Sequence, residues 1–407
     1  MGKTYRTILN IVLVVSIHLT GIAQEKPLSV LLLNRETLLK EHQQYQKNLQ
    51  HATPMVVQLL SDAKSALDAK PVSVMQKSDV PPSGDKHDYM SLGPYWWPDT
   101  TKPNGLPYIR RDGEVNPEYR SSGDNERMGK MMNQVQALAL AYCITEDEKY
   151  AEKASKHLQV WFLDEATKMN PNLNYGQAIK GVNQGRGIGI IETYQLRDLI
   201  DAFILLKHSP FWTREIDEGI TGWFSDYLRW LIESGHGKDE SVEKNNHGSA
   251  YDVQVSCIAL YLGKPAIAKR ILSEAGTKRI AVQIEPDGSQ PLELARTKSW
   301  GYSVMNLDAL IELALLGERV GIDLWNFQTK DGRSIRQAVN FLIPYALGVK
   351  KWTWRQIVPL NPDRMYYALR IAAEKFNSAS YAKTAQAVWN RDVQSARKMF
   401  FIQPIHD

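Results

Sequence analysis

The hydrophobic pattern of this chain is that of a helical protein. From about residue 130 onward, apolar residues recur every three or four positions, as on a helix with one buried face. Breaks rich in Gly, Pro, Asn or Asp separate these segments, and alternating strand patterns are scarce. The pattern predicts helices over residues 131–144, 150–162, 189–206, 218–232, 251–262, 266–275, 305–316, 334–347, 365–373 and 381–399, and a short extended stretch with a turn over 282–288.

The succession of these helices indicates the fold class. Many helices joined by short loops in one long chain favour helical hairpins arranged as a ring or solenoid. No motif recurs at a fixed spacing, which argues against a regular repeat array. We therefore predict an all-α protein in which roughly six to seven helical hairpins form an incomplete (α/α) toroid. Residues 24–407 are expected to form this single domain.

The first 23 residues have the pattern of a secretory signal. Lys3 and Arg6 precede an apolar run from Ile8 to Leu19, and small residues surround a cleavage position before Gln24. The run is short for a membrane span, although a single anchoring helix is the alternative. We expect residues 1–23 to be a signal peptide and the mature protein to be secreted to the periplasm, without stable membrane insertion.

Charge and cysteine content narrow the class of partner. The formal net charge is +4 and there is no basic run, so we expect no nucleic-acid partner. A nearly neutral chain can still hold a local basic cleft for an anionic polymer. The two cysteines, Cys143 and Cys257, lie in apolar helical contexts, and we expect free thiols in preference to a disulfide. The sequence does not fix the oligomeric state.

A long irregular segment, residues 79–127, interrupts the helical pattern and is rich in Pro, Gly, Asp and aromatic residues. Such segments are usually functional loops or disordered, and the aromatic content argues against disorder. Aromatic rings stack on sugar rings, and arginines pair with carboxylates. The alternative is that the rings pin the loop to the core. Together with a glycine-rich stretch at 181–187, this segment supplies the candidate substrate-binding residues Tyr95, Trp96, Trp97, Arg110, Arg111, Arg127, Asn183 and Gln184.

Two short stretches carry the side chains needed to remove a proton from carbon beside a carboxylate. They are Asn245-Asn246-His247-Gly248 and residues 293–302. Elimination from a uronate needs a neutralised carboxylate, a base for the C5 proton and an acid for the departing O4. The amide of Asn246 and the guanidinium of Arg296 suit the first role. Asn245 or Gln184 is a supporting neutraliser.

The same stretches supply the base and the acid. His247 is the candidate base because an imidazole titrates near neutral pH. Tyr302 is the candidate acid, and on some substrates also the base, if Arg296 or Lys298 lowers its pKa. The alternative for Asn245-Asn246-His247 is an ordinary helix N-cap, where Asn is favoured. His-Glu-x-x-His, Cys-x-x-Cys, EF-hand and Gly-x-Ser-x-Gly motifs are absent from the sequence, so we expect no metal and no cofactor.

These motifs resemble the alginate lyase superfamily of helical polysaccharide lyases. The resemblance spans residues 88–355 and is carried by the block from Asp88 to Asp99, the Asn-Asn-His-Gly run and the Glu-Leu-Ala-Arg-Thr run. It is strongest to polysaccharide lyase family 38, whose members act on alginate or on β-1,4-glucuronan. The resemblance implies an (α/α) toroid with a deep cleft and no required metal.

The resemblance also implies residue roles. Asn246 and Arg296 act as neutralisers, His247 acts as base, and Tyr302 acts as acid or as both acid and base. One spacing departs from the classical pattern, because Tyr302 follows the arginine by six residues instead of seven.

We thus expect a lyase that cleaves 1,4-linked polyuronic acid, foremost alginate, and leaves a 4,5-unsaturated uronate. A glucuronan lyase is the alternative within this class. A uronide-binding protein without catalysis is one alternative of another class. A glycoside hydrolase with two catalytic carboxylates is the other, and its candidates are Asp124, Asp252, Glu285 and Glu293.

Overall fold

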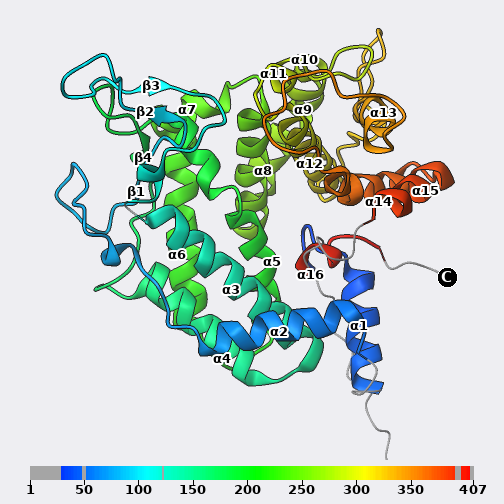
Figure 1. The fold of residues 1–407 in the computed structure, drawn as a ribbon. Coiled ribbons are helices and arrows are strands. Elements are labelled where there is room, and N and C mark those ends of the chain that lie inside the picture. The colour runs from blue at the N-terminus through cyan, green and yellow to red at the C-terminus, as the bar shows by residue number, and fades with distance from the viewer. Residues whose placement is uncertain (1–28, 48–51, 122, 390–395, 404–407) are drawn as a thin grey trace, which may run out of the picture.

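Helices dominate the computed structural model, which describes residues 29–47, 52–121, 123–389 and 396–403 (Figure 1). The first part of the chain forms α1 (Arg35–Lys47), α2 (Pro54–Asp68), α3 (Asp124–Thr145) and α4 (Glu148–Leu158). The middle forms α5 (Leu196–Leu206), α6 (Arg214–Glu233), α7 (Gly235–Ser241), α8 (Asn246–Tyr261) and α9 (Pro265–Ala275). The last part forms α10 (Ala281–Gln283), α11 (Pro291–Leu294), α12 (Ser299–Glu318), α13 (Ile335–Ala346), α14 (Tyr366–Lys375), α15 (Ala379–Val388) and α16 (Ala396–Met399).

The helices are arranged as an arch that does not close into a full ring, as expected for an incomplete toroid (Figure 1). Neighbouring helices pack in sequence: α3 on α4 and α5, α8 on α9 and α12, and α14 on α15. Helix α16 returns to contact α2 and α3. The all-α prediction is therefore confirmed. Within the described residues, no helix is both long enough and apolar enough to span a membrane, and the expected signal peptide lies outside those residues.

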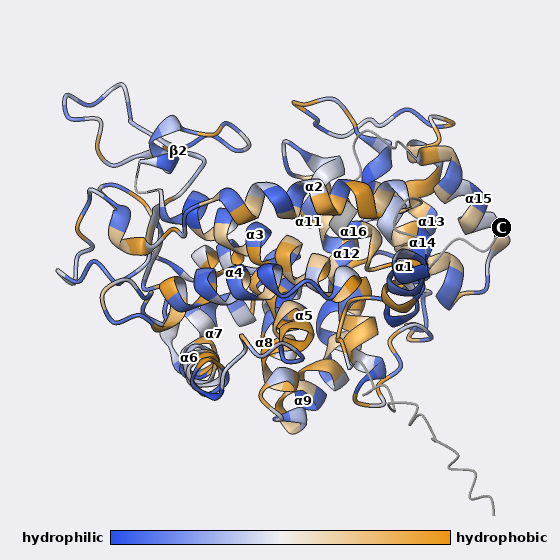
Figure 2. Ribbon diagram, turned by 90° about the horizontal axis from the view of Figure 1, so that it is seen from below, coloured by the Kyte–Doolittle hydropathy of each residue, from blue (hydrophilic) through white to orange (hydrophobic). Residues whose placement is uncertain are grey.

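The core runs through the central helices. Most residues of α8 and α12 are buried on every side, and hydrophobic positions are dense on α5 and α8 (Figure 2). The buried carboxylates of these helices have charged partners inside the protein: Asp252 accepts from Arg279 at 2.7 Å and Glu312 accepts from Arg197 at 3.0 Å. Cys143 and Cys257 are both free thiols, as predicted.

Most predicted helices are present, with local differences. The helix predicted over 189–206 is divided into a 3₁₀ segment, η5 (Gly187–Thr193), and α5, and Gly189 in the 3₁₀ segment lies directly against the backbone of Gly176. The helix predicted over 381–399 ends at Val388, where Trp389 is extended. The extended stretch predicted at 282–288 begins helical in α10, although the expected turn at Glu285–Gly288 is present.

The irregular segment 79–127 contributes three short strands to two small pairs of strands. Strand β1 (Met90–Leu92) pairs in parallel with β4 (Tyr175–Ala178), and β2 (Trp96–Trp97) pairs antiparallel with β3 (Ile109–Arg110). These strands lie at one end of the arch (Figure 1). The described residues of the segment are thus ordered, as its aromatic content predicts, and its loop between Pro94 and Asn116 reaches the residues just before α12, where Asp112 accepts from Arg296.

Candidate active site

A cavity of about 520 Å³ opens between the strand pairs and the ends of α8 and α12. Both sequence motifs contribute to its walls, so residues separated by about fifty positions meet in one place. The predicted residues that line it are Tyr95, Trp96, Arg110, Asn245, Asn246, His247, Arg296, Lys298 and Tyr302. The lining also includes residues that were not predicted, namely Pro94, Gln177, Arg186, Ile188, Ile191, Gly301, Met305 and Arg364.

The lining of this cavity is strongly cationic. Four arginines and one lysine reach it, namely Arg110, Arg186, Arg296, Lys298 and Arg364, whereas none of the described residues that line it is Asp or Glu. Clustered charge of one sign in a cleft attracts ligands of the opposite sign. The cavity is therefore suited to a polyanion, although the formal charge of the whole chain is only +4.

The first turn of α8 presents Asn246 and His247 to the cavity. Asn245 caps the helix by accepting a hydrogen bond from the His247 backbone N–H at 3.0 Å. The capping alternative thus holds for Asn245 and does not exclude a role for its two neighbours. Gly248 is required by close packing, because a Cβ there would lie 2.1 Å from Glu243 O and 2.2 Å from Arg279 Nη1.

Arg279 fixes the loop that leads into α8. It donates to Ser241 O at 2.7 Å and to Glu243 O at 2.6 Å, and it forms a buried ion pair with Asp252 at 2.7 Å. The arginine and the aspartate are both almost completely buried. Since Asp252 neutralises this structural arginine, it is not available as a hydrolytic acid.

His247 is oriented by a carboxylate that the sequence analysis did not single out. Its Nδ1 lies 2.8 Å from Glu240 Oε1, and Glu240 is 1% exposed. An ionised carboxylate only accepts hydrogen bonds, so Nδ1 carries the hydrogen and Nε2 is left with a lone pair. Glu240 lies on α7, seven residues before His247, and that short separation was the available signal.

Asn246 is held by Glu293. The Asn246 backbone N–H and side-chain Nδ2 each donate to one Glu293 carboxyl oxygen at 2.7 Å. Both residues are 1% exposed. Burial raises the pKa of Glu293 above its usual range, against the opposing effects of Asn246, Arg296 and His247. Glu293 therefore supports the amide from behind and does not line the cavity itself.

Arg296 and Tyr302 form one unit with Asp112. Arg296 Nη2 donates to the Tyr302 hydroxyl oxygen at 2.8 Å, so the six-residue spacing brings the phenol to the guanidinium. Arg296 also binds Asp112 through Nε and Nη2, at 3.1 and 2.9 Å. Although burial acts to raise it, hydrogen bonds from Arg296 and Thr297 hold the pKa of Asp112 well below its usual range.

The pKa of Tyr302 corrects one expectation from the sequence. Burial raises this pKa, the adjacent Tyr95 hydroxyl at 2.8 Å raises it further, and the opposing effect of Arg296 does not compensate. The net shift is upward, whereas the sequence analysis expected Arg296 or Lys298 to lower it. A phenol that keeps its proton is suited to an acid role.

The aromatic-rich loop reaches across the cavity from the strand side. The pairing of Trp96 with Arg110 in the β2–β3 ladder places both side chains at the cavity. Tyr95 contacts Tyr302, and Lys298 lies 5.8 Å from the Tyr95 ring centre. The loop is anchored on the far side by Asp112, so its aromatic residues both shape the cavity and hold the loop.

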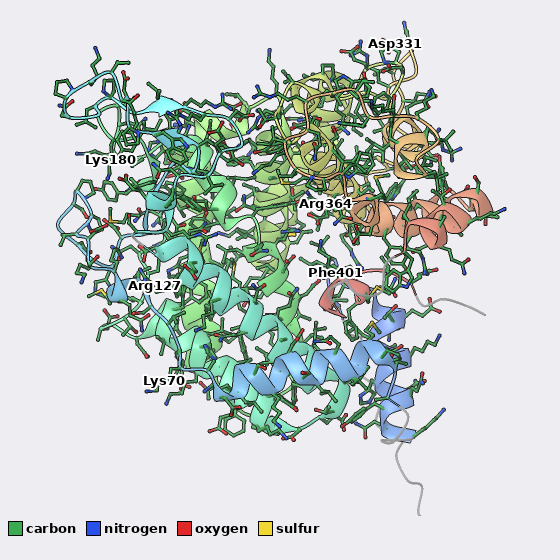
Figure 3. All side chains as sticks on the ribbon, viewed as in Figure 1. Lys70, Arg127, Lys180, Asp331, Arg364 and Phe401 are labelled. Carbon is green, nitrogen blue, oxygen red and sulfur yellow. The ribbon has the colours of Figure 1, made fainter. Side chains whose placement is uncertain are left out.

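Five predicted binding residues do not line the cavity. Trp97 donates to Glu114 O and stacks under Arg111, so these two stabilise the loop itself. Arg127 bonds to Asp124 beside the start of α3, far from Arg364 in Figure 3, because the buried Asp124 needs a cationic partner. Asn183 and Gln184 are exposed on a turn, where Asn183 accepts from the Ile179 backbone.

Three polar cavity residues were missed by the sequence analysis. Arg186, which belongs to the glycine-rich stretch already noted, donates to the backbone and side-chain oxygens of Gln177 at 2.9 Å. Arg364 comes from η7 (Pro362–Met365) and lies beside Gly301, where an added Cβ would be 2.7 Å from Nη1. Gln177 and Arg364 lie in stretches that no motif marked, so only the fold identifies them.

The candidate hydrolase carboxylates do not form a catalytic pair. Asp124 is buried against Lys77 and Arg127, and Glu285 forms an ion pair with Arg333 at 3.1 Å. With Asp252 on Arg279 and Glu293 on Asn246, none of the four lines the cavity. In the described part of the chain, no cluster of three or more His, Cys, Asp or Glu residues is placed to hold a metal ion.

Comparison with known proteins identifies the family. The sequence model of the family described as alginate lyase matches residues 73–352, which include both motifs and the aromatic-rich loop. The chain belongs to the alginate lyase family. It is accordingly an enzyme of the polysaccharide lyase class. No curated protein matches this alginate lyase family member.

Solved structures support the same assignment. A crystal structure of an alginate lyase from Bacteroides ovatus shares 41% identity with this chain, with a TM-score of 0.87, over 92% of this chain and 98% of the other. Alginate lyase A1-III from Sphingomonas species A1 shares 17% identity, with a TM-score of 0.51, over 87% and 91%. A variant of A1-III in complex with a tetrasaccharide shares 16% identity, with a TM-score of 0.51, over 86% and 90%. The likeness to A1-III shows a common toroid fold.

Proposed function

We propose that this enzyme cleaves 1,4-linked polyuronic acid, foremost alginate, by β-elimination that needs no metal. The observation that carries this proposal is the composition of the cavity. It joins an amide, an imidazole, a guanidinium and a phenol, and it is ringed by cations without a lining carboxylate. A hydrolase would require two carboxylates facing the scissile bond. The substrate named for the Bacteroides ovatus relative, alginate, agrees with this composition.

The proposed mechanism begins with the C6 carboxylate of the sugar whose C5 proton is removed. Asn246 and the remaining Nη1 edge of Arg296 donate to this carboxylate and stabilise the charge that builds up on it. Within the described residues, the hydrogen bonds of Arg296 use only Nε and Nη2. Neutralisation makes the neighbouring C5 proton acidic enough to be removed.

His247 then takes the C5 proton and Tyr302 protonates the departing O4. Glu240 holds the His247 ring with its Nε2 lone pair available as base and stabilises the imidazolium that forms. The C4–O4 bond breaks as the C4–C5 double bond forms, and the Tyr302 proton passes to O4. The raised pKa of Tyr302 keeps that proton in place until the leaving oxygen needs it.

Three finer points belong to the same proposal. We assign the enzyme to polysaccharide lyase family 38, on the resemblance of its three motifs. We propose that it is secreted and acts in the periplasm, on the pattern of residues 1–23. β-1,4-Glucuronan is the alternative substrate, because glucuronate has the same configuration at C4 and C5 as mannuronate.

The test is ultraviolet absorbance during incubation with polymannuronate, polyguluronate and glucuronan, with Tyr302→Phe run in parallel. We expect a rise from the conjugated double bond with an alginate, and loss of that rise in Tyr302→Phe. A rise in absorbance on glucuronan alone would mean that glucuronan, and not alginate, is the substrate. Chain shortening without a double bond would indicate a hydrolase, and binding without either change would indicate a uronide-binding protein.

A further inference from the structure

Within the described residues, the side-chain amide of Asn246 has a hydrogen-bond partner at its nitrogen and none at its oxygen. Its Nδ2 and its backbone N–H are both bound to Glu293 at 2.7 Å. Its Oδ1 is buried and accepts no hydrogen bond from the described residues. A buried acceptor without a donor is destabilising. This arrangement would also direct an acceptor, Oδ1, away from Glu293, whereas a uronate carboxylate needs donors.

The two ends of an amide have nearly the same shape, so the side chain can turn over without moving its neighbours. In the turned orientation, Oδ1 lies against the Glu293 carboxyl group and Nδ2 takes the place that Oδ1 held. Two acceptors would then meet unless Glu293 carries a proton. A protonated carboxyl group has one O–H donor and keeps its second oxygen as an acceptor, which matches Asn246 Oδ1 and the Asn246 backbone N–H.

We propose that Glu293 is a positioning residue that is held protonated, donates its hydrogen to Asn246 Oδ1 and thereby turns the Asn246 NH₂ group toward the substrate carboxylate. The inference rests on the proposed function, because a uronate supplies that carboxylate. The proton stays on Glu293 throughout, and no bond is made or broken at this residue. Its effect is to provide a donor where the reaction develops negative charge.

The surroundings of Glu293 agree with a retained proton. It is 1% exposed, and burial raises its pKa. The charged groups facing it are Arg296, from its own segment, and His247, when protonated, from α8. Both act to lower the pKa of Glu293, but Arg296 is already paired with Asp112 and His247 with Glu240. A second ionised carboxylate beside that of the substrate would repel it, and protonation removes this repulsion.

Glu293→Gln is the decisive variant, since it copies the protonated form. The glutamine NH₂ replaces the O–H donor, and its carbonyl oxygen still accepts from the Asn246 backbone. We expect Glu293→Gln to keep most of the wild-type kcat on the preferred uronan. Glu293→Ala should lose about 10²–10³-fold in kcat, the loss typical for removing an aligned donor. Thermal unfolding of both variants shows whether either is merely misfolded.

The pH dependence of activity distinguishes this role of Glu293 from a purely structural one. The protonated form is the competent one and its pKa is raised, so wild-type activity is retained below that pKa and falls as the pH rises through it. Glu293→Gln should lack this alkaline fall. In infrared difference spectra of the two proteins, the wild type should show a carboxylic acid carbonyl band that Glu293→Gln lacks.

A folded Glu293→Gln enzyme as inactive as Glu293→Ala would overturn the inference, because an ionised carboxylate would then be required. An unchanged alkaline limb in Glu293→Gln, or no carboxylic acid band in the wild type, would also overturn it. These outcomes differ from failure of the proposed function, in which the wild type yields no unsaturated product from any uronan. The infrared band reports on Glu293 even in that case.

Discussion

Glu240 Oε1 lies 2.8 Å from His247 Nδ1, and the carboxyl group is buried behind the ring while the ring reaches the cavity. The contact fixes both the tautomer and the orientation of the imidazole. Gly187 makes room for α7, because a Cβ at position 187 would lie 2.7 Å from His236 O and 3.2 Å from Glu240 N. The base of the proposed reaction thus depends on a residue outside the motif that carries it.

Replacing Glu240 should impair the chemical step more than binding. Glu240→Gln can offer an N–H to Nδ1 and so favour the tautomer whose Nε2 is protonated and unable to act as base. We expect kcat to fall by about 10²-fold or more, with little change in KM. Steady-state kinetics on polymannuronate measure this. Asp239→Asn, an exposed neighbour on the same helix, is the control and should behave as wild type. Full activity of Glu240→Gln would contradict the assigned role.

His247→Ala should slow cleavage of both alginate blocks, but not equally. Loss of a general base costs about 10²–10⁴-fold. Mannuronate is cleaved by syn elimination, in which Tyr302 lies on the side of the proton and can partly substitute. Guluronate needs anti elimination, in which it cannot. Because the pKa of Tyr302 is raised, Tyr302 should act only slowly as a base even on mannuronate. Initial rates on the two block polymers test this, and equal residual rates would count against it.

Arg364 should bind the carboxylate of a neighbouring sugar. It lines the cavity beside Gly301 of α12. Arg364 has no hydrogen bond or ion pair with the described residues. Arg364→Ala should raise KM by about 10- to 150-fold, since a hydrogen bond to a charged group is worth about 1.5–3 kcal/mol, and leave kcat nearly unchanged. The effect should vanish on oligouronates too short to reach it. Arg214→Ala, another exposed arginine on the distant α6, is the matched control.

Asp112 should support Arg296 and Tyr302 while holding the loop. In Asp112→Asn the guanidinium loses its charged partner, so its alignment with the phenol weakens and kcat falls. Because the pKa of Asp112 is lowered by folding, its contribution to stability is present above the unfolded pKa near 4 and is lost as the pH falls through the folded pKa. Stability differences between wild type and variant should therefore shrink in strong acid.

Denaturant unfolding at several pH values measures the Asp112 prediction. Asp99→Asn is the control, since Asp99 lies on the same loop and its side chain, among the described residues, accepts hydrogen bonds only from Thr101. If Asp99→Asn lowered kcat as much as Asp112→Asn, the loop as a whole and not the Arg296 contact would be responsible.

The Arg279–Asp252 pair should be a structural requirement of the site. Removing one partner of a buried ion pair leaves an uncompensated charge, which costs about 3–5 kcal/mol. Arg279→Met should therefore lower the free energy of unfolding by about that amount and displace the loop before α8. Urea denaturation gives the stability, and kinetics on the folded fraction give the activity. A variant of wild-type stability would contradict the buried-pair interpretation.

The sequence by itself determined the helices and the chemistry of the motifs. A period of three to four residues is a local property, so most helices could be predicted, as could the order of the aromatic loop and the capping role of Asn245. The types of side chain at 246, 247, 296 and 302 favoured the proposal of proton removal beside a carboxylate. These conclusions need no contact between distant residues.

Only the tertiary structure decided how these groups meet and what surrounds them. Arg186 and Arg364 come from separate segments, and only packing brings their charges to one cavity. Glu240 and Asp112 lie outside its lining, where they bind His247 and Arg296. The same holds for Arg127, whose charge is taken by the buried Asp124. The pKa of Tyr302 rises because burial and Tyr95 outweigh Arg296, a balance set by distances that exist only in the folded chain.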